Sequence, residues 1–146
     1  MKFVAQRVLR ATLTVNGQLV SEIGRGLVVF LGVKTDDGVA KAEKIAEKIA
    51  KLRVFSDENG KMNLCVRDIV GEVLLVSQFT LYGDAQKGNR PSFTAAARPE
   101  LADPLYSDVA RILKETWGVS VKTGVFGADM RILQENDGPV TIIYEI

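Results

Sequence analysis

The stretch GEVLLVSQFTL, residues 71–81, joins an apolar run directly to a cluster of hydroxyl and amide side chains. An apolar run such as residues 73–76 is typical of a strand that is buried on both faces. The five residues that follow, 77–81, place two hydroxyls and an amide at the end of that strand. Because a buried strand fixes its own end, the sequence predicts polar groups held rigidly at the edge of the core.

Upstream of this stretch, an alternating pattern predicts a β-hairpin. Every second residue from position 9 to position 15 is apolar, which is the period of a half-buried strand, so these side chains, beginning with Leu9, are expected to share one face. Asn16-Gly17 supplies the positive φ angles of a type I′ turn, so Gln18–Ile23 should return as the partner strand. A second apolar run, residues 27–31, predicts another strand buried on both faces.

Two helices are expected. Residues 39–52 place apolar side chains on one face and lysines and glutamates on the other, as in an amphipathic helix. A second helix is expected to begin with Asp103 as the N-cap residue and Pro104 in the first helical position, and to end at Gly118. Residues 82–98, between the apolar stretch and this helix, form a polar loop, and loops of that length usually serve function or are mobile.

Three further strands are expected in the last part of the chain. They cover residues 119–122, 130–135 and 140–146, and Asn136-Asp137-Gly138-Pro139 separates the last two as a turn. The whole chain has 146 residues, the length of one ordinary domain, and the sequence contains neither an internal repeat nor a linker. We therefore expect a single domain over residues 1–146.

Composition limits the chemistry. The chain is 47% hydrophobic and 25% charged, as expected of a soluble globular protein. It contains no histidine and one cysteine, Cys65, which excludes imidazole catalysis, structural zinc sites and internal disulfides. A net charge of +1 means that a nucleic acid would have to be bound by a local patch. Arg7 and Arg10 interrupt the N-terminal stretch, so we expect neither a signal peptide nor a membrane span there, and a cytoplasmic location.

Two groups of polar residues have more than one interpretation. Ser77 and Thr80 could act as nucleophiles, but a hydroxyl needs a base, and at a strand end it more often satisfies loop backbone groups. Lys87, Arg90 and Arg98 in the long loop could bind phosphate or could form a solvated surface. Neither group indicates a function by itself.

Five segments become specific when they are taken together. They are residues 6–8 (QRV), 77–81 (SQFTL), 88–93 (GNRPSF), 126–130 (FGADM) and 136–141 (NDGPVT). In this combination the chain closely resembles the D-aminoacyl-tRNA deacylase family over essentially its full length. The two signature motifs of that family, SQxxL and NxGPxT, both occur here without departure.

The resemblance implies an α/β fold of α+β type, in which mostly antiparallel sheets form a barrel-like core with two or three helices. It also implies a homodimer with active sites at the interface, and no cofactor. In this family the Gly138-Pro139 peptide is cis and reaches into the pocket of the partner subunit. Its carbonyls grip the amino group of a D-aminoacyl group and leave no space for an L side chain, and Arg7 braces the motif.

The implied reaction is hydrolysis of the ester bond of D-aminoacyl-tRNA, which releases the free D-amino acid and the tRNA and so proofreads chirality in translation. Glycine mischarged on alanine tRNA is an expected further substrate, because glycine has no side chain to exclude. The backbone N–H of Phe79, helped by Gln78, is the expected oxyanion donor. The 2′-hydroxyl of the terminal ribose is expected to organise the water, so no imidazole is required.

The resemblance also assigns the remaining site residues. Phe79 or Phe126 should pack on the terminal adenosine, and Met130 should line the same wall of the pocket. The residues implied to carry catalysis are Ser77, Gln78, Phe79 and Thr80. The residues implied to bind the substrate are Gly138, Pro139, Phe126, Met130, Arg7 and Ala102.

Two alternatives remain open. Within the enzyme class, Thr80 itself could be acylated. Outside it, the chain could be a non-catalytic module that binds RNA 3′ ends, because the basic loop residues occur together with Phe79 and Phe93, and charge combined with stacking suits single-stranded ends. The second alternative does not explain why a buried strand ends in hydrogen-bond donors.

Overall fold

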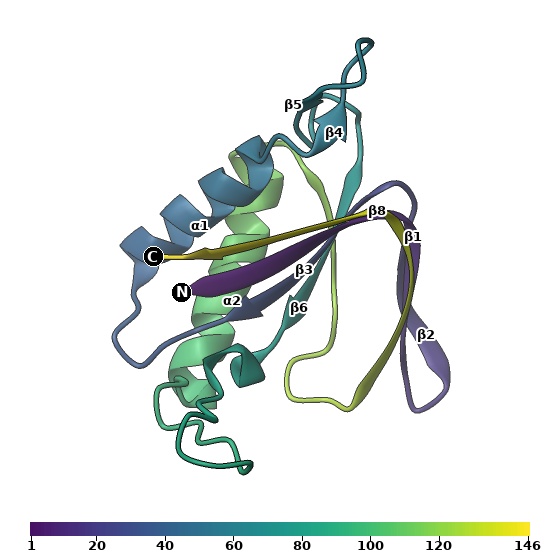
Figure 1. Cartoon of the computed structure of the whole chain (residues 1–146). Helices are drawn as coiled ribbons and strands as arrows, with labels where there is room; N and C mark the ends of the chain where they lie inside the picture. The colour runs from purple at the N-terminus through teal and green to yellow at the C-terminus, as the bar shows by residue number, and fades with distance from the viewer.

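Strand β1, Lys2–Val15, organises the sheet of the computed structural model, which describes residues 1–146 (Figure 1). One edge of β1 pairs antiparallel with β3, Gly26–Gly32, along its first half and with β2, Gln18–Ile23, along its second half. The other edge pairs antiparallel with β8, Met130–Glu145. Because β1 and β8 bend together, the sheet curls into a barrel-like core.

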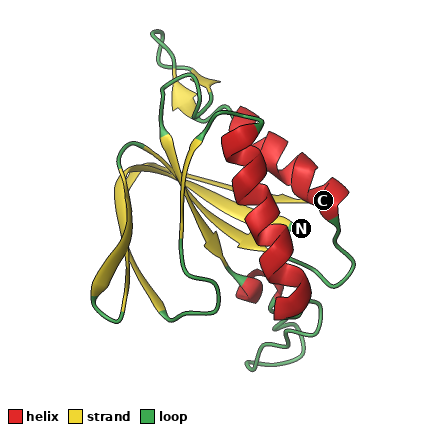
Figure 2. Ribbon diagram, turned by 180° about the vertical axis from the view of Figure 1, so that it is seen from behind, coloured by secondary structure: helices red, strands yellow, loops and turns green.

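Two strands extend the sheet beyond β3 in parallel pairing. β6, Glu72–Ser77, lies beside β3, and β7, Ser120–Thr123, lies beside β6. Parallel neighbours need crossover connections, and these two contain the helices α1, Val39–Lys51, and α2, Pro99–Glu115. Both helices cover the same face of the sheet (Figure 2).

Three short elements complete the fold. β4, Phe55–Ser56, and β5, Met62–Leu64, form a small separate hairpin after α1. A single 3-10 turn, η1, Phe79–Tyr82, follows β6 after one intervening residue. This turn is where the chain leaves the buried strand and enters the long polar loop.

The central strands β3 and β6 are buried on both faces, as the two apolar runs predicted. Val29 and Leu75 belong to the core beneath the helices, whereas Val28 and Leu74 belong to a second core inside the bent sheet. All four side chains are fully buried. A strand held from both sides has little freedom at its end, so Ser77 is fixed where β6 leaves the core.

Most other predicted elements are confirmed. The Asn16-Gly17 turn has positive φ angles of 51° and 78° and joins β1 to β2 as predicted. The amphipathic helix is present as α1, and the strands expected over 18–23 and 119–122 are present as β2 and β7 within one residue. Four of the six strand pairings are antiparallel, so the expected fold class is confirmed.

The predicted start of the second helix is wrong. Pro99, not Pro104, occupies the first helical position, and Pro104 lies inside α2. Either proline is compatible with a helix start, because a residue in the first turn has no intrahelical acceptor for its N–H. Pro104 lies one turn further on, so its missing N–H costs the helix one hydrogen bond without stopping it. The helix ends at Glu115, slightly before the predicted end, and Gly118 follows with a φ of 65°.

The predicted turn at residues 136–139 is also wrong, because β8 continues through it. Asn136 pairs with Val8 and Thr141 pairs with Gln6, so the residues between Asn136 and Thr141 bulge out of a continuous strand. The Gly138-Pro139 peptide at this bulge is cis, as the resemblance implied. A side chain at position 138 would meet its neighbours, since Gly138 has a φ of 125° and an added Cβ would lie 2.9 Å from Val140 Cγ2.

The same bulge explains why Leu9 is exposed, although the alternation placed it with the buried residues. The pairing between β1 and β8 changes register on both sides of Val8. Val8 is therefore fully buried and Leu9 is 46% exposed, while Ala11 and Leu13 point inward as predicted.

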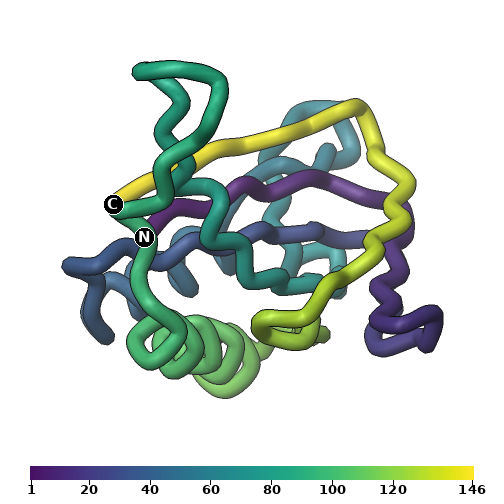
Figure 3. Tube along the Cα trace, turned by 90° about the horizontal axis from the view of Figure 1, so that it is seen from below, coloured from purple at the N-terminus to yellow at the C-terminus, as the bar shows by residue number.

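The two ends of the chain lie side by side (Figure 3). The amino group of Met1 donates to Ile146 O at 3.1 Å and to Asp37 Oδ1 at 2.8 Å. Lys41 Nζ donates to the same Asp37 oxygen at 2.9 Å, and Lys34 N–H donates to the other at 2.7 Å. Burial alone would raise the pKa of Asp37, but these donors outweigh burial and hold the pKa below its usual value.

No helix is long and apolar enough to span a bilayer.

Candidate active site

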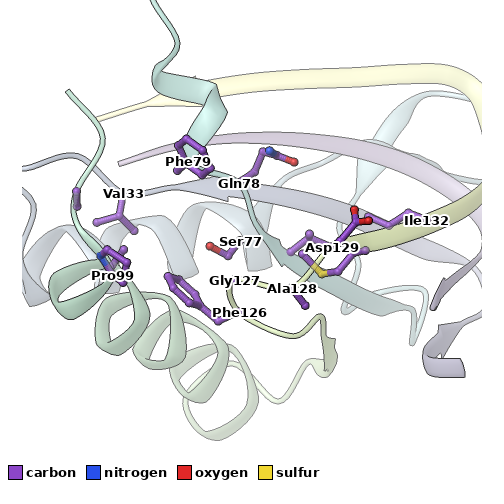
Figure 4. A pocket seen from close by; sticks show the side chains of 14 residues that line it. Val33, Ser77, Gln78, Phe79, Pro99, Phe126, Gly127, Ala128, Asp129 and Ile132 are labelled. Atoms are coloured by element: carbon purple, nitrogen blue, oxygen red, sulfur yellow. The ribbon is translucent and has the colours of Figure 1, made fainter. Parts of the chain in front are cut away.

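A cavity of about 500 Å³ opens where β6 ends, between the start of α2 and the segment that leads into β8 (Figure 4). Nine of its 14 lining residues are hydrophobic. Ser77 lies near the middle, with Phe79 and Pro99 on one side and Asp129 and Ile132 on the other. The cavity therefore forms at the strand end that the sequence singled out.

The chain direction at this strand end is set by the backbone. Gln78 N–H donates to Leu31 O at 2.8 Å, which extends the pairing of β6 with β3 by one residue. Phe79 then begins η1, and the first N–H of a helix has no acceptor inside that helix. The Gln78 N–H is therefore already engaged, whereas the Phe79 N–H has no intrahelical partner, so help from Gln78 in binding an oxyanion is left to its side-chain amide.

Thr80 lies outside the cavity lining. Its side chain is exposed, and its Oγ1 accepts a short hydrogen bond from Gln78 Nε2. Gln78 does line the cavity. Thr80 thus contacts the cavity through Gln78, whose amide it holds in one orientation.

The apolar wall is formed by residues from three different elements. Phe126 and Met130 come from the segment before β8 and from its first residue, and Ala102 comes from α2. The Phe126 ring lies 6.1 Å from the ring of Tyr106, whose hydroxyl donates to Leu75 O at 2.7 Å. Burial raises the pKa of Tyr106 well above its usual range, so this phenol stays protonated and keeps donating. The wall is thereby tied to the middle of β6.

An aromatic pair borders the cavity on the side of the long loop. The rings of Phe79 and Phe93 meet edge to face with centroids 5.2 Å apart, and their exposed fractions are 55% and 37%. The same loop carries Lys87, Arg90 and Arg98, which are exposed and form no ion pair within the chain. Exposed rings, together with unpaired cations on the same loop, are suited to stacking on bases and to contacting phosphates.

Gly138 and Pro139 do not line this cavity. They are exposed at the bulge of β8, and Arg7 holds that bulge from β1. Arg7 Nε lies 3.2 Å from Asp137 O and 3.1 Å from Asp137 Oδ2, while Nη1 donates to Val54 O at 2.6 Å. The residues implied by the resemblance therefore fall into two groups, one at the cavity and one at the bulge.

Sequence reasoning missed several lining residues. Asp129 is the only charged side chain in the lining, and it lies within the FGADM segment, of which only Phe126 and Met130 were selected. Val33, Ala97 and Pro99 also line the cavity, and none of these residue types carries a chemical signal in the sequence. Val33 and Ala97 come together through a long-range contact, in which Ala97 N–H donates to Val33 O at 2.9 Å. No three His, Cys, Asp or Glu side chains lie close enough together to hold a metal ion.

The chain resembles known proteins along nearly its whole length. Residues 4–145 match the family model described as D-Tyr-tRNA(Tyr) deacylase. The chain is 54% identical to a D-aminoacyl-tRNA deacylase of Anaeromyxobacter dehalogenans over 99% of this chain and 97% of that protein. It is 57% identical to a D-aminoacyl-tRNA deacylase of Koribacter versatilis, again over 99% and 97%.

Two solved structures share the fold. One is described as a c-Myc DNA unwinding element binding protein. It is 44% identical to this chain with a TM-score of 0.95, and the match covers 100% of this chain and 99% of that protein's chain. The other, a probable eukaryotic D-amino acid tRNA deacylase, is 17% identical with a TM-score of 0.88 over 99% and 98% of the two chains, which shows a common fold. With relatives above 50% identity over nearly the whole length, the chain belongs to the D-aminoacyl-tRNA deacylase family.

Proposed function

We propose that this protein, acting as one domain over residues 1–146 in the cytoplasm, hydrolyses the ester bond of D-aminoacyl-tRNA. The products are the free D-amino acid and the tRNA. The observation that carries the proposal is the backbone N–H of Phe79, which has no acceptor in η1 and belongs to a residue that lines the cavity. The family of the chain supplies the class of substrate.

The Phe79 N–H is suited to binding an oxyanion. In ester hydrolysis water adds to the carbonyl carbon, the bond to the ribose oxygen breaks, and that oxygen takes up a proton. A preorganised donor to the tetrahedral oxyanion contributes about 2.7–4 kcal/mol where one has been removed. β6 is buried on both faces, so it holds this donor without reorganisation. The 2′-hydroxyl of the terminal ribose lies next to the ester and organises the water, which suits a chain without histidine.

The borders of the cavity are suited to the end of a tRNA. Phe79 and Phe126 line the cavity, and the terminal adenine can stack on the face of either ring. Lys87, Arg90 and Arg98 carry positive charge on the adjoining loop, where the phosphates of a single-stranded end would lie. This arrangement provides the local patch that a chain of net charge +1 requires.

A second copy of the chain completes the site in this proposal. Ile143 is 68% exposed on β8 and is in register with Val4 on β1, which is in register with Phe30 on β3. These three apolar residues cross the face of the sheet opposite the helices, and a partner covering that face would bury them. In the resulting two-fold dimer, Gly138 and Pro139 of each protomer reach the cavity of the other.

The exposed bulge then supplies selectivity by exclusion. The carbonyls of Gly138 and Pro139 bind the amino group of a D-aminoacyl ester and occupy the space that an L side chain would need. Glycine has no side chain to exclude, so glycine mischarged on alanine tRNA is also hydrolysed.

The test is to incubate the protein with D-Tyr-tRNA and with L-Tyr-tRNA and to follow the release of free tyrosine. We expect rapid release from the D-substrate and little from the L-substrate. A D-Tyr-tRNA that ends in 2′-deoxyadenosine tests the role of the ribose hydroxyl, and an unchanged rate on it would exclude that role. Equal release from both enantiomers would contradict the exclusion of L-substrates.

A second candidate function is binding of RNA 3′ ends without hydrolysis. The exposed Phe79–Phe93 pair beside three unpaired cations favours it, because these features alone suffice for binding. The same experiment separates the two functions. Tight binding of D-Tyr-tRNA without release of tyrosine would support the binding module.

A further inference from the structure

A chain of side-chain hydrogen bonds lies beside the bulge of β8. Gln134 Nε2 donates to Gln6 Oε1 at 2.6 Å and to Asn136 Oδ1 at 2.9 Å. Gln6 Nε2 in turn donates to Thr141 Oγ1 at 3.4 Å. Asn136 and Thr141 are the paired residues that flank the bulge, and Gln6 belongs to the strand opposite. Gln134 therefore contacts one end of the bulge directly, at Asn136, and reaches the other end, at Thr141, through Gln6.

This chain and Arg7 hold the bulge from opposite sides. Gln6 and Arg7 are consecutive residues of β1, so their side chains leave opposite faces of the sheet. Arg7 reaches Val54 O and the backbone of Asp137 on the helix side. Gln134 lies on the same face as Met130 and Ile132, which pack against the second core and line the cavity. The bulge is thus clamped between two independent sets of contacts.

The position of Gln134 is costly for the fold. Its Oε1 is buried and accepts no hydrogen bond, whereas the preceding residues on the same face are apolar. A buried acceptor without a partner destabilises a protein, and an apolar residue would avoid that loss. Local conflicts of this kind are expected where function, not stability, determines the residue.

We propose that Gln134 is a positioning residue for selectivity, which holds the Gly138-Pro139 bulge through Gln6 and Asn136. This inference rests on the proposed role of Gly138 and Pro139 in excluding L-aminoacyl groups. Gln134 acts on the bulge through the side chains of Gln6 and Asn136, and it contacts neither the ester nor the oxyanion donor. Its loss therefore changes the choice between enantiomers more than it changes the maximal rate.

The test compares Gln134→Met, Gln134→Glu and wild-type protein on D-Tyr-tRNA and L-Tyr-tRNA. Methionine keeps the length of the side chain but removes both donated hydrogen bonds, so we expect the ratio of kcat/KM for the D- and L-substrates to fall about tenfold. Glutamate restores the ratio, because the amides of Gln6 and Asn136 can turn and donate to its carboxylate. Gln18→Met, the same change at an exposed glutamine of β2, is the matched control and leaves the ratio unchanged.

The outcomes separate this inference from the proposed function. If wild-type protein does not distinguish D-Tyr-tRNA from L-Tyr-tRNA, the proposed function fails first. If wild-type protein is selective and Gln134→Met keeps its full selectivity, the positioning role of Gln134 is wrong. A thermal unfolding curve for each variant identifies simple destabilisation, which would lower both activities together and leave their ratio unchanged, and that result also contradicts the inference.

Discussion

The two motif-bearing segments of this chain are held in opposite ways. The segment Ser77–Thr80 follows a strand that is buried on both faces, and its backbone position is set by the cores around β6. The bulge around Gly138 and Pro139 is exposed on β8 and is held by side chains, chiefly those of Arg7 and Gln134. Ser77, Gln78 and Phe79 line the cavity of their own chain, whereas Gly138 and Pro139 do not.

This difference separates rate from selectivity. A backbone donor on a rigid strand end needs only its own chain, so it should serve the chemical step. In the proposed dimer, the exposed bulge acts only when the partner subunit brings it to a cavity, so it should serve the choice of substrate. Changes at the strand end should therefore lower the rate without altering the preference for D-substrates. Changes at the bulge should lower that preference as well as the activity on D-substrates, because the bulge also binds their amino group.

The largest expected effect comes from breaking the proposed dimer. Ile143→Asp places a carboxylate among Val4 and Phe30, and an unpaired charge buried in an interface costs several kcal/mol. We expect a folded monomer whose activity on D-Tyr-tRNA is at least about a hundredfold lower, since neither cavity receives a bulge. Sedimentation and amino acid release measure the two effects.

The control for this change is Val70→Asp. Val70 is 91% exposed and lies outside β8, so the same added charge should leave both assembly and activity intact. A fully active Ile143→Asp monomer would show that the bulge has no role in the partner cavity, and the separation of rate from selectivity would then fail.

The next largest effect is expected from Arg7, which holds the bulge of β8 from the face of the sheet that the helices cover. Arg7→Ala removes the contacts to Asp137 and leaves Val54 O without its donor. We expect activity on D-Tyr-tRNA to fall by about ten- to a hundredfold, in line with the loss of charged hydrogen bonds, and the preference over L-Tyr-tRNA to fall with it. The kcat/KM of both substrates measures this change.

Arg10→Ala is the matched control on the same strand. Arg10 pairs with Glu135 at 2.9 Å, but its side chain is 77% exposed, and exposed pairs contribute little. We expect wild-type selectivity from this variant. Equal losses in both variants would mean that general charge on β1, and not the clamp on the bulge, supports activity.

The contrast between the segments also explains what the sequence could predict. The buried strands were predictable because a local apolar run decides them, as at residues 27–31 and 73–76. The bulge was not, because Asn136-Asp137-Gly138-Pro139 has the local composition of a turn, and only the long pairing of β1 with β8 keeps the strand continuous. The helix start failed for a similar reason, since Pro99 and Pro104 are equally suited to it by local rules.

The residues that line the cavity also differ in how well the sequence could identify them. Ser77, Gln78 and Phe79 belong to one continuous motif and lie together in the lining. Asp129 lies within the FGADM segment, residues 126–130, but the sequence did not mark it as a site residue. Val33 and Ala97 could not be found from sequence, because they meet only through a backbone hydrogen bond between segments more than sixty residues apart in the numbering.

A smaller effect is expected from the hydroxyls of the strand end. Ser77→Ala and Thr80→Ala should lower kcat on D-Tyr-tRNA by about three- to thirtyfold, because each removes a hydrogen bond or a polar neighbour but not the Phe79 N–H. The preference for the D-substrate should remain unchanged. Mass spectrometry of the protein during turnover should find no acyl group on Thr80, whose exposed hydroxyl accepts a hydrogen bond from Gln78. A covalent aminoacyl-Thr80 species would instead establish the nucleophilic mechanism.

The smallest effect on deacylation is expected from Asp37, which supports the cavity wall and does not touch the bulge. Asp37 accepts from Lys34 N–H, next to Val33 in the lining. Its pKa is lower in the folded protein than in the unfolded chain, where about 3.9 is usual, so its ionised form stabilises the fold above that pH. As the pH falls below about 4 and Asp37 takes up a proton, this stabilisation is lost.

We expect the melting temperature of wild-type protein to fall in this range and to approach that of Asp37→Asn, which lacks the ionisable group. At neutral pH the variant should unfold at a lower temperature but keep the D-over-L preference of wild-type protein. A changed preference would show that the cavity wall and the bulge are coupled, and the two segments could no longer be treated as independent.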